Sequence, residues 1–301
     1  MADPEIAKLR AVMAARPRAT EIAQMRLDSD ARGLAFGLAA DVTVQPVNAN
    51  GVKAEWTSTP SADPANAILY LHGGGYVLCS LDSHRHLAAE VGRAAGARTL
   101  AIDYRLAPEH PFPAPVEDAV AAYRYMLDSG LKPARIAFAG DSAGGGLVIA
   151  AILAIREAGL PLPGCGWCIS PWVDMQATGA SFVDRAETDP TVQKATITMM
   201  AEWYLGGADP RHPHASPVHG DLRGFPPLLI QVGSVETLLD DSIALARKAG
   251  TADVPVDLQI WPEMIHIWHL YFPVLSAARR AIASGGLFVR NTLRPDITAP
   301  A

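Results

Sequence analysis

The sequence has few cysteines, no long apolar run and no excess of positive charge. Its three cysteines in 301 residues are too few for the disulfide framework of a small secreted protein. The longest apolar run, residues 147–155, is far shorter than the roughly 20 residues that a membrane-spanning helix needs. Acidic residues outnumber basic ones by 31 to 25, so the clustered Lys and Arg of a nucleic-acid-binding surface are not expected. These features argue against disulfide-rich, membrane-spanning and nucleic-acid-binding proteins.

Composition and length favour one large globular domain. Half of the residues are hydrophobic and 19% are charged, which supports a sizeable core and argues against long disorder. A chain of 301 residues suits one α/β domain with a modest insertion.

The first residues, Met1–Glu5, carry acids where a secretory signal has positive charge, so we expect a cytoplasmic location. Cys165 and Cys168 have redox-motif spacing but lie in an apolar run, where we expect a buried structural role.

Short apolar strands alternate with helices from residue 67 onward. The expected strands span residues 67–71, 98–103, 135–140, 164–170, 227–232 and 256–261. The expected helices begin near Asp82, Pro115, Ser142, Thr237 and Trp268. This alternation predicts the α/β class, with a mostly parallel central sheet flanked by helices. Before it we expect two antiparallel strands, 42–47 and 52–56, and two amphipathic helices, 4–15 and 19–31.

A serine stands at the turn between an expected strand and an expected helix. The strand leads into Gly140–Gly144, which reads Gly-Asp-Ser-Ala-Gly, and a buried helix continues from Leu147. The G-x-S-x-G spacing fits a nucleophile elbow, in which glycines leave room for neighbouring backbone around Ser142. The N–H of Ala143, at the start of the helix, would face a developing oxyanion. The alternative is an ordinary glycine-rich turn.

A second glycine motif, His72–Gly75, directly follows the first expected parallel strand. A glycine-rich loop of this kind beside a nucleophile elbow supplies further N–H donors for an oxyanion. We choose Gly74, Gly75 and Ala143 as the donors, with Gly73 as the alternative if the loop is shifted by one residue. Two motifs with complementary chemistry therefore indicate a serine hydrolase.

The order of five motifs resembles that of the hormone-sensitive-lipase-like esterases, the bacterial family IV of the α/β-hydrolase superfamily. The motifs are His72–Gly75, Asp103–Glu109, His110–Ala114, Gly140–Gly145 and Ala215–Pro217. The resemblance implies the α/β-hydrolase fold with a helical cap. It also implies that His72 supports the oxyanion loop, with a role as base as the alternative for His72, and we expect Gly73 to belong to the same loop support. The implied division is cap helices 1–36, core 37–171, cap insertion 172–222, core 223–290 and a C-terminal tail 291–301.

A serine nucleophile needs a base to take its proton and an acid to orient that base. In this fold both partners follow the serine, in loops after later strands. The family has an aspartate where Glu236 stands, but glutamate keeps the carboxylate, so we expect Glu236 as the acid and Asp240 as the alternative. His266 follows the last expected strand, where the family's catalytic histidine falls, and His269 lies about one turn further into the next helix.

The expected activity is hydrolysis of short- to medium-chain acyl esters by Ser142, His266 and Glu236, through an acyl-enzyme and without a cofactor or metal. The same residues would suit a lactone or amide hydrolase. A ligand-binding module on a hydrolase scaffold is a less favoured alternative from another class. His212, His214 and His219 form a histidine group only by composition, so they predict no metal site.

Two further expectations concern the substrate and the assembly. Candidate acyl-pocket residues lie on an expected helix at 195–204, where ordinary helix core is the alternative; they are Met199, Met200, Trp203 and Tyr204. The last strand, 255–261, is expected to expose a pairing edge, and resembling enzymes are often dimers through this region. We therefore expect a homodimer.

Overall fold

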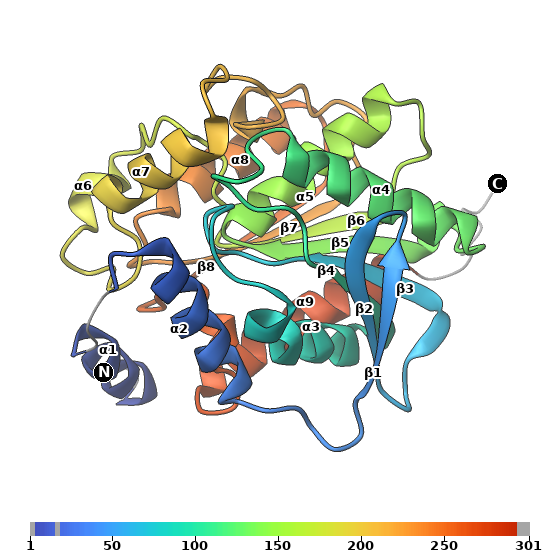
Figure 1. Ribbon diagram of the computed structural model, residues 1–301, viewed down its shortest axis with the longest axis horizontal. Helices are drawn as coiled ribbons and strands as arrows, with labels where there is room; N and C mark the ends of the chain where they lie inside the picture. The colour runs from blue at the N-terminus through green and yellow to red at the C-terminus, as the bar shows by residue number, and fades with distance from the viewer. Residues whose placement is uncertain (1–3, 16–18, 294–301) are drawn as a thin grey trace.

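The computed structural model describes residues 4–15 and 19–293, and its centre is an eight-stranded sheet in the order β1-β2-β4-β3-β5-β6-β7-β8 (Figure 1). β1 and β2 form the expected hairpin, β2 pairs antiparallel with β4, and the remaining strands run parallel. The strands are β1 Thr43–Ala49, β2 Val52–Ser58, β3 Asp63–Leu71, β4 Ala97–Ile102, β5 Ile136–Asp141, β6 Cys165–Ile169, β7 Leu228–Gly233 and β8 Val256–Trp261. The predicted α/β class and the mostly parallel sheet are confirmed.

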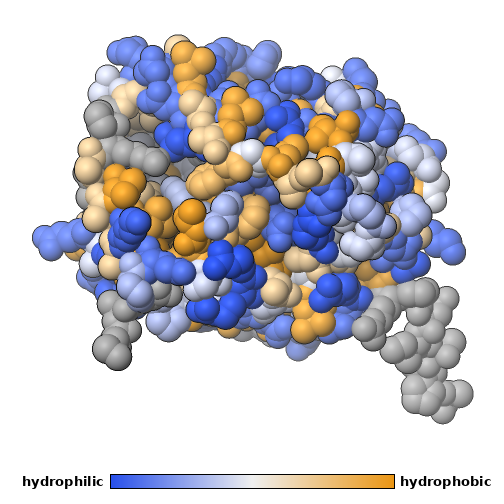
Figure 2. All heavy atoms as spheres, turned by 90° about the horizontal axis from the view of Figure 1, so that it is seen from below, coloured by the Kyte–Doolittle hydropathy of each residue, from blue (hydrophilic) through white to orange (hydrophobic). Residues whose placement is uncertain are grey.

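Helices cover both faces of the sheet. α3 (Leu81–Ala95) and α9 (Ser276–Thr292) lie on one face, and α4 (Ala114–Asp128), α5 (Ala143–Glu157) and α8 (Leu239–Thr251) lie on the other (Figure 1). Seen from the side of α3 and α9, the surface mixes hydrophilic and hydrophobic residues (Figure 2).

Residues of the central strand β3 alternate between two hydrophobic cores. Leu69 and Leu71 belong to the core shared with α4 and α5, whereas Ile68 and Tyr70 belong to the core shared with α3 and α9. Because successive side chains of a strand point to opposite faces, a strand covered on both sides is apolar throughout. This explains why the parallel strands read as continuous apolar runs in the sequence.

The expected start of the last helix, near Trp268, is wrong. A short 3-10 helix, η3 (Trp268–Tyr271), occupies that position, and α9 begins only at Ser276. Pro273 stands between the two, and a proline inside a helix lacks the N–H for its hydrogen bond and restricts the residue before it. His269 therefore lies in η3 rather than in a long helix.

Two segments outside the sheet lie over its carboxyl-terminal end. One contains α1 (Pro4–Ala14) and α2 (Ile22–Leu34), and the other contains α6 (Ser181–Asp184), α7 (Lys194–Leu205) and the 3-10 helix η2 (Pro217–His219) (Figure 1). No helix among residues 4–15 and 19–293 is long and apolar enough to cross a membrane.

Arg26 fastens α2 to the core. Its guanidinium donates to the carbonyl oxygens of Val77 and Ala107, at 2.8 and 3.0 Å, and pairs with Glu109 at 2.8 Å. Between the two segments, Arg10 of α1 donates to the carbonyl oxygen of Thr188 at 3.0 Å. Of the predicted tail, residues 291–301, those from 294 on lie outside the described residues.

Candidate active site

Ser142 occupies the turn between β5 and α5 in a strained backbone conformation. Its φ is 54° and its ψ is −120°, a region that side-chain-bearing residues rarely adopt. The N–H of Ser142 donates to the carbonyl oxygen of Ile169 at 2.8 Å, and the N–H of Trp172 donates to the carbonyl oxygen of Ser142 at 2.9 Å. These bonds hold the turn in the geometry of a nucleophile elbow.

The glycines after Ser142 are required by close contacts with neighbouring backbone. A Cβ added to Gly144 would overlap the carbonyl oxygens of Leu71 and His72, and one added to Gly146 would overlap the carbonyl oxygen of Trp172. The first turns of α5 therefore press against the loops that follow β3 and β6. This close approach outweighs the low helix propensity of glycine.

We expect Gly144→Ala to destabilise the protein by at least about 1–3 kcal/mol, because the new methyl group displaces the backbone of β3. Gly250→Ala in α8 is the matched control, since nothing lies within 4 Å of its added Cβ. That control should be stabilising by about 0.5–1 kcal/mol, as usual for alanine in place of a helical glycine. Urea unfolding measures both changes, and equal stability of the two variants would contradict the close-contact explanation.

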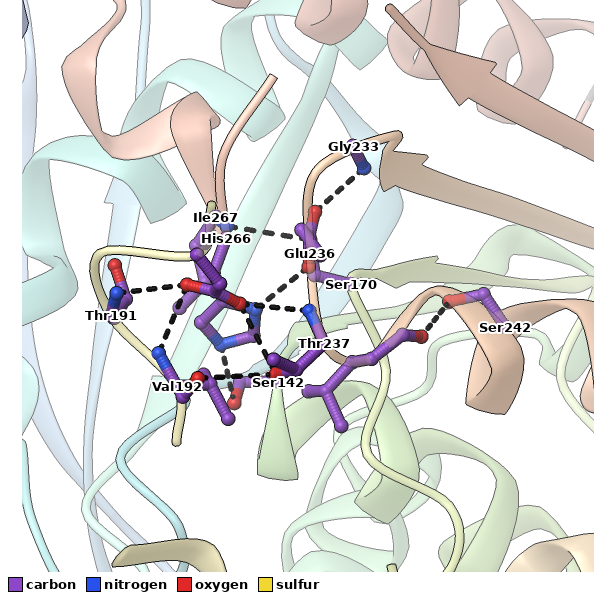
Figure 3. Close-up of polar contacts among 12 residues, drawn as sticks. Ser142, Ser170, Thr191, Val192, Gly233, Glu236, Thr237, Ser242, His266 and Ile267 are labelled. Carbon is purple, nitrogen blue, oxygen red and sulfur yellow. Dashed lines mark hydrogen bonds and ion pairs between the residues drawn. The ribbon is translucent and has the colours of Figure 1, made fainter. Parts of the chain in front are cut away.

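Three side chains at the carboxyl ends of β5, β7 and β8 form one hydrogen-bonded chain (Figure 3). His266 Nε2 lies 2.9 Å from Ser142 Oγ, and His266 Nδ1 lies 2.8 Å from Glu236 Oε2. All three are buried, but Ser142 keeps 7% exposure while Glu236 has none. The structure thus brings together the residues that the sequence predicts as nucleophile, base and acid.

Two donors hold the far oxygen of the Glu236 carboxylate. Oε1 accepts hydrogen bonds from the N–H of Gly233 at 2.6 Å and from Ser170 Oγ at 2.7 Å. Ser170 also accepts a hydrogen bond from the N–H of Ile267 at 3.3 Å, so it joins the acid loop to the histidine loop (Figure 3). Sequence reasoning missed Ser170, although its position directly after a parallel strand is where functional side chains gather.

The alternative acid, Asp240, lies elsewhere. Its Oδ2 accepts a hydrogen bond from the N–H of Ser181 at 2.9 Å, and its own N–H donates to Ser181 Oγ at 3.1 Å. It therefore links the start of α8 to α6. His269 likewise forms its hydrogen bond with another residue than Ser142, because its Nε2 lies 2.9 Å from Gln231 Oε1.

The pair of His266 and Glu236 favours the protonated imidazole. Burial alone would lower the pKa of His266, but the hydrogen bond and charge of Glu236 outweigh burial and raise it above its usual value. Burial also raises the pKa of Glu236, against the opposing hydrogen bond from His266. The imidazole is thus prepared to hold a proton taken from Ser142.

The loop after β3 presents free N–H groups beside the serine. Gly74 and Gly75 have φ values of 102° and 64°, which glycine adopts without strain. Within residues 4–15 and 19–293, the N–H groups of Gly74, Gly75 and Ala143 donate to no other protein atom. Gly73 packs against Asp141, since an added Cβ would overlap the Asp141 carboxylate. The predicted oxyanion donors are therefore available.

His72 lies behind this loop. Its ring stacks on Tyr104 with 4.2 Å between centroids, and its Nδ1 lies 2.7 Å from the carbonyl oxygen of Gly73. Tyr104 Oη in turn donates to the carbonyl oxygen of His72 at 2.7 Å. These contacts suit a residue that supports the loop.

The candidate pocket residues on α7 divide into two pairs. Met200 and Tyr204 are buried, whereas Met199 and Trp203 are partly exposed. Met200 packs directly on Gly75, because a Cβ added to Gly75 would overlap the Met200 sulfur. The ring of Tyr204 stacks on that of Tyr76, with 3.8 Å between the ring centroids. One face of α7 therefore rests on the oxyanion loop.

Comparisons with known proteins agree with this geometry. Residues 68–270 match the model of a family described as alpha/beta hydrolase fold. An acetyl-hydrolase of Streptomyces hygroscopicus is 49% identical over 97% of this chain and 98% of its own length. A carboxylesterase of Mycobacterium tuberculosis, NlhH, is 34% identical over 77% of this chain and 75% of its own length.

Solved structures extend the likeness to nearly the whole chain. The crystal structure of an esterase from the bacterial hormone-sensitive lipase family has 47% identity and a TM-score of 0.95, and the match covers 98% of this chain and 100% of that one. The crystal structure of EstE5, soaked with p-nitrophenyl butyrate, has 49% identity and a TM-score of 0.93, and the match covers 97% of this chain and 99% of that one. The protein therefore belongs to the α/β-hydrolase-fold family and, within it, to the hormone-sensitive-lipase-like esterases.

Proposed function

We propose that the protein is a serine carboxylesterase that hydrolyses short- to medium-chain acyl esters through an acyl-enzyme. The hydrogen-bonded chain from Ser142 through His266 to Glu236 is the single observation that carries this proposal. Its esterase relatives support the same chemistry.

In the first half of the reaction Ser142 Oγ attacks the ester carbonyl while His266 Nε2 takes its proton. Glu236 keeps Nδ1 protonated and stabilises the imidazolium that forms. The carbonyl oxygen becomes an oxyanion, which the N–H groups of Gly74, Gly75 and Ala143 bind. When the intermediate collapses, His266 returns the proton to the leaving alcohol, and the acyl group stays on Ser142.

In the second half a water molecule attacks the acyl-enzyme. His266 takes a proton from the water, the same N–H groups bind the second oxyanion, and the proton passes to Ser142 Oγ as the acid product leaves. In each half-reaction His266 therefore accepts one proton and passes it on, first from Ser142 to the leaving alcohol and then from water to Ser142.

We infer that the segments 1–36, of which residues 1–3 and 16–18 lie outside the described residues, and 172–222 form the cap and limit the acyl group. The contact of Met200 with Gly75 supports this, because it sets α7 directly over the oxyanion loop. Met199, Met200, Trp203 and Tyr204 are the proposed acyl-side residues. A cap this close to the reacting carbon favours small acyl groups, and the acetyl-hydrolase name of one relative agrees with that preference.

The test of this function is kcat/KM over p-nitrophenyl esters of increasing acyl length. We expect a maximum at short or medium chains, followed by a decline. Activity on lactones or amides with none on these esters would favour the alternative hydrolases, and activity on no substrate would favour a ligand-binding module.

The pKa of His266 predicts the acid side of the pH profile. Hydrolysis needs a neutral imidazole in the free enzyme, so kcat/KM should fall as His266 becomes protonated. Since Glu236 raises this pKa, the fall should be centred above the ordinary histidine value of about 6.5. In Glu236→Gln the charge is lost, so the residual activity should extend to lower pH. The pH dependence of kcat/KM for p-nitrophenyl butyrate is measured for the wild type and for Glu236→Gln. If the fall at low pH had the same midpoint in both proteins, Glu236 would not be the residue that raises the pKa of His266.

We also propose a homodimer that pairs through β8. This strand hydrogen-bonds only to β7 within the described part of the chain, and Ile260 on it is 44% exposed. Light scattering of the purified protein tests the proposal. A monomer at all concentrations would overturn it.

A further inference from the structure

A buried pair of ionisable side chains lies beneath the oxyanion loop. Asp141, the residue before Ser142, is fully buried, and its Oδ1 accepts a hydrogen bond from Tyr70 Oη at 2.7 Å. Its Oδ2 lies 3.2 Å from Nε2 of His84, a buried residue of α3. Ser83 Oγ lies 2.8 Å from the other ring nitrogen of His84. The reaction proposed above uses none of these four groups.

The Asp141 carboxylate contacts the oxyanion loop itself. A Cβ added to Gly73 would overlap Asp141 Oδ2 and would lie 3.2 Å from the Cβ of Ser142. Gly73 is thus packed between the carboxylate and the nucleophile. A negative charge at this place lies close to the position where the carbonyl oxygen becomes an oxyanion.

An uncompensated carboxylate there would oppose the reaction. Charges interact strongly in a buried site, where the effective dielectric constant is far below that of water. The donors of an oxyanion site act by stabilising developing negative charge, so a nearby anion would cancel part of their effect. The site therefore needs a positive charge next to Asp141.

We propose that His84 is a positioning residue that stays protonated as the counter-ion of Asp141, so that the carboxylate holds the oxyanion loop without repelling the oxyanion. This inference rests on the proposed esterase function.

The ionisation of the neighbours supports this assignment. Burial would lower the pKa of His84, but the charge and hydrogen bond of Asp141 outweigh it and raise the pKa to about 10. His72 does not supply the charge, because burial and the positive charge of His84 lower its pKa to about 4. The titratable groups that face the pair from the surrounding elements are Tyr70, His72, Cys79, His86, Tyr104, His266 and His269.

The test compares His84→Gln with the double variant His84→Gln/Asp141→Asn. In His84→Gln the carboxylate has no counter-ion, so kcat should fall by at least about tenfold as rising pH ionises Asp141, with KM changed much less. In the double variant both charges are absent, and the alkaline loss should disappear. The readout is kcat and KM for p-nitrophenyl butyrate as a function of pH, with thermal unfolding measured for each variant.

Two results would overturn the inference. Equal loss in the single and double variants at every pH would assign His84 a structural role, and full kcat of His84→Gln at alkaline pH would show that its charge is not needed. If His84→Gln fails to fold, an NMR titration of the histidine side chains in the wild-type protein still decides, because His84 must stay protonated over the whole pH range of activity. A His84 ring that is neutral at about pH 8 would overturn the inference.

These outcomes are separate from the esterase proposal. Absence of hydrolysis by the wild-type protein would refute the proposed function before any variant is compared. Hydrolysis by the wild type with an unchanged pH profile in His84→Gln would refute only the role of His84.

Discussion

Replacing Ser142 by alanine is expected to lower kcat for p-nitrophenyl ester hydrolysis by about 10⁴- to 10⁶-fold, because the acyl-enzyme cannot form. The fold should remain intact. The elbow is held by backbone hydrogen bonds to Ile169 and Trp172, and the only side-chain hydrogen bond of Ser142 recorded in the described residues is the one to His266. Steady-state kinetics measures the fall in kcat, and circular dichroism shows whether the fold is intact.

Ser129→Ala is the matched control for this loss. Ser129 is an exposed serine at the end of α4, where its hydroxyl donates to the carbonyl oxygen of Tyr125. Its replacement should leave kcat unchanged. If folded Ser142→Ala kept more than about a hundredth of the wild-type kcat, another nucleophile would have to be sought.

Replacing Glu236 by glutamine is expected to lower kcat by about 10³- to 10⁴-fold, the size of effect seen when the acid of a triad becomes an amide. The surroundings determine how the amide sits. The N–H of Gly233 can only donate, so the amide oxygen must face it, and the NH₂ group must face His266. That contact would put the proton on His266 Nε2, which could then no longer accept the proton of Ser142.

Asp240→Asn is the matched control, because it changes a neighbouring carboxylate in the same way. Asp240 bonds to Ser181 rather than to His266, so this variant should keep kcat within about threefold and lose at most some stability. The kcat values of Glu236→Gln and Asp240→Asn are compared at one pH near neutrality. A much larger loss of kcat in Asp240→Asn than in Glu236→Gln would identify Asp240, not Glu236, as the acid of the triad.

The parts of the fold that depend on local sequence are predictable from it. The apolar runs of β3, β5, β6 and β7 mark strands buried on both faces; β3 begins four residues before its expected start, and every other bound of the four lies within one residue of the expected one. The turn at Ser142 is also predictable, because its glycines meet steric demands that are local to the strand–helix junction. The start of α9 is predicted too early, because Pro273 separates η3 from α9 while the apolar pattern continues across both.

Contacts between residues that are far apart in the sequence cannot be predicted from local sequence patterns. Ser170 meets Glu236 across 66 residues, and His84 meets Asp141 across 57, so no spacing rule connects either pair. The packing of Met200 on Gly75 likewise depends on how α7 folds over the core. Sequence patterns identify the reacting groups, whereas the three-dimensional packing identifies the groups that position them.

The most direct test of the central claim is covalent labelling with a fluorophosphonate, followed by intact-protein mass and peptide mapping. We expect one adduct per chain on Ser142, no adduct in Ser142→Ala and much slower labelling in Glu236→Gln. Absence of labelling in the wild-type protein, or an adduct on any other residue, would contradict the assignment of Ser142 as the nucleophile of a serine esterase.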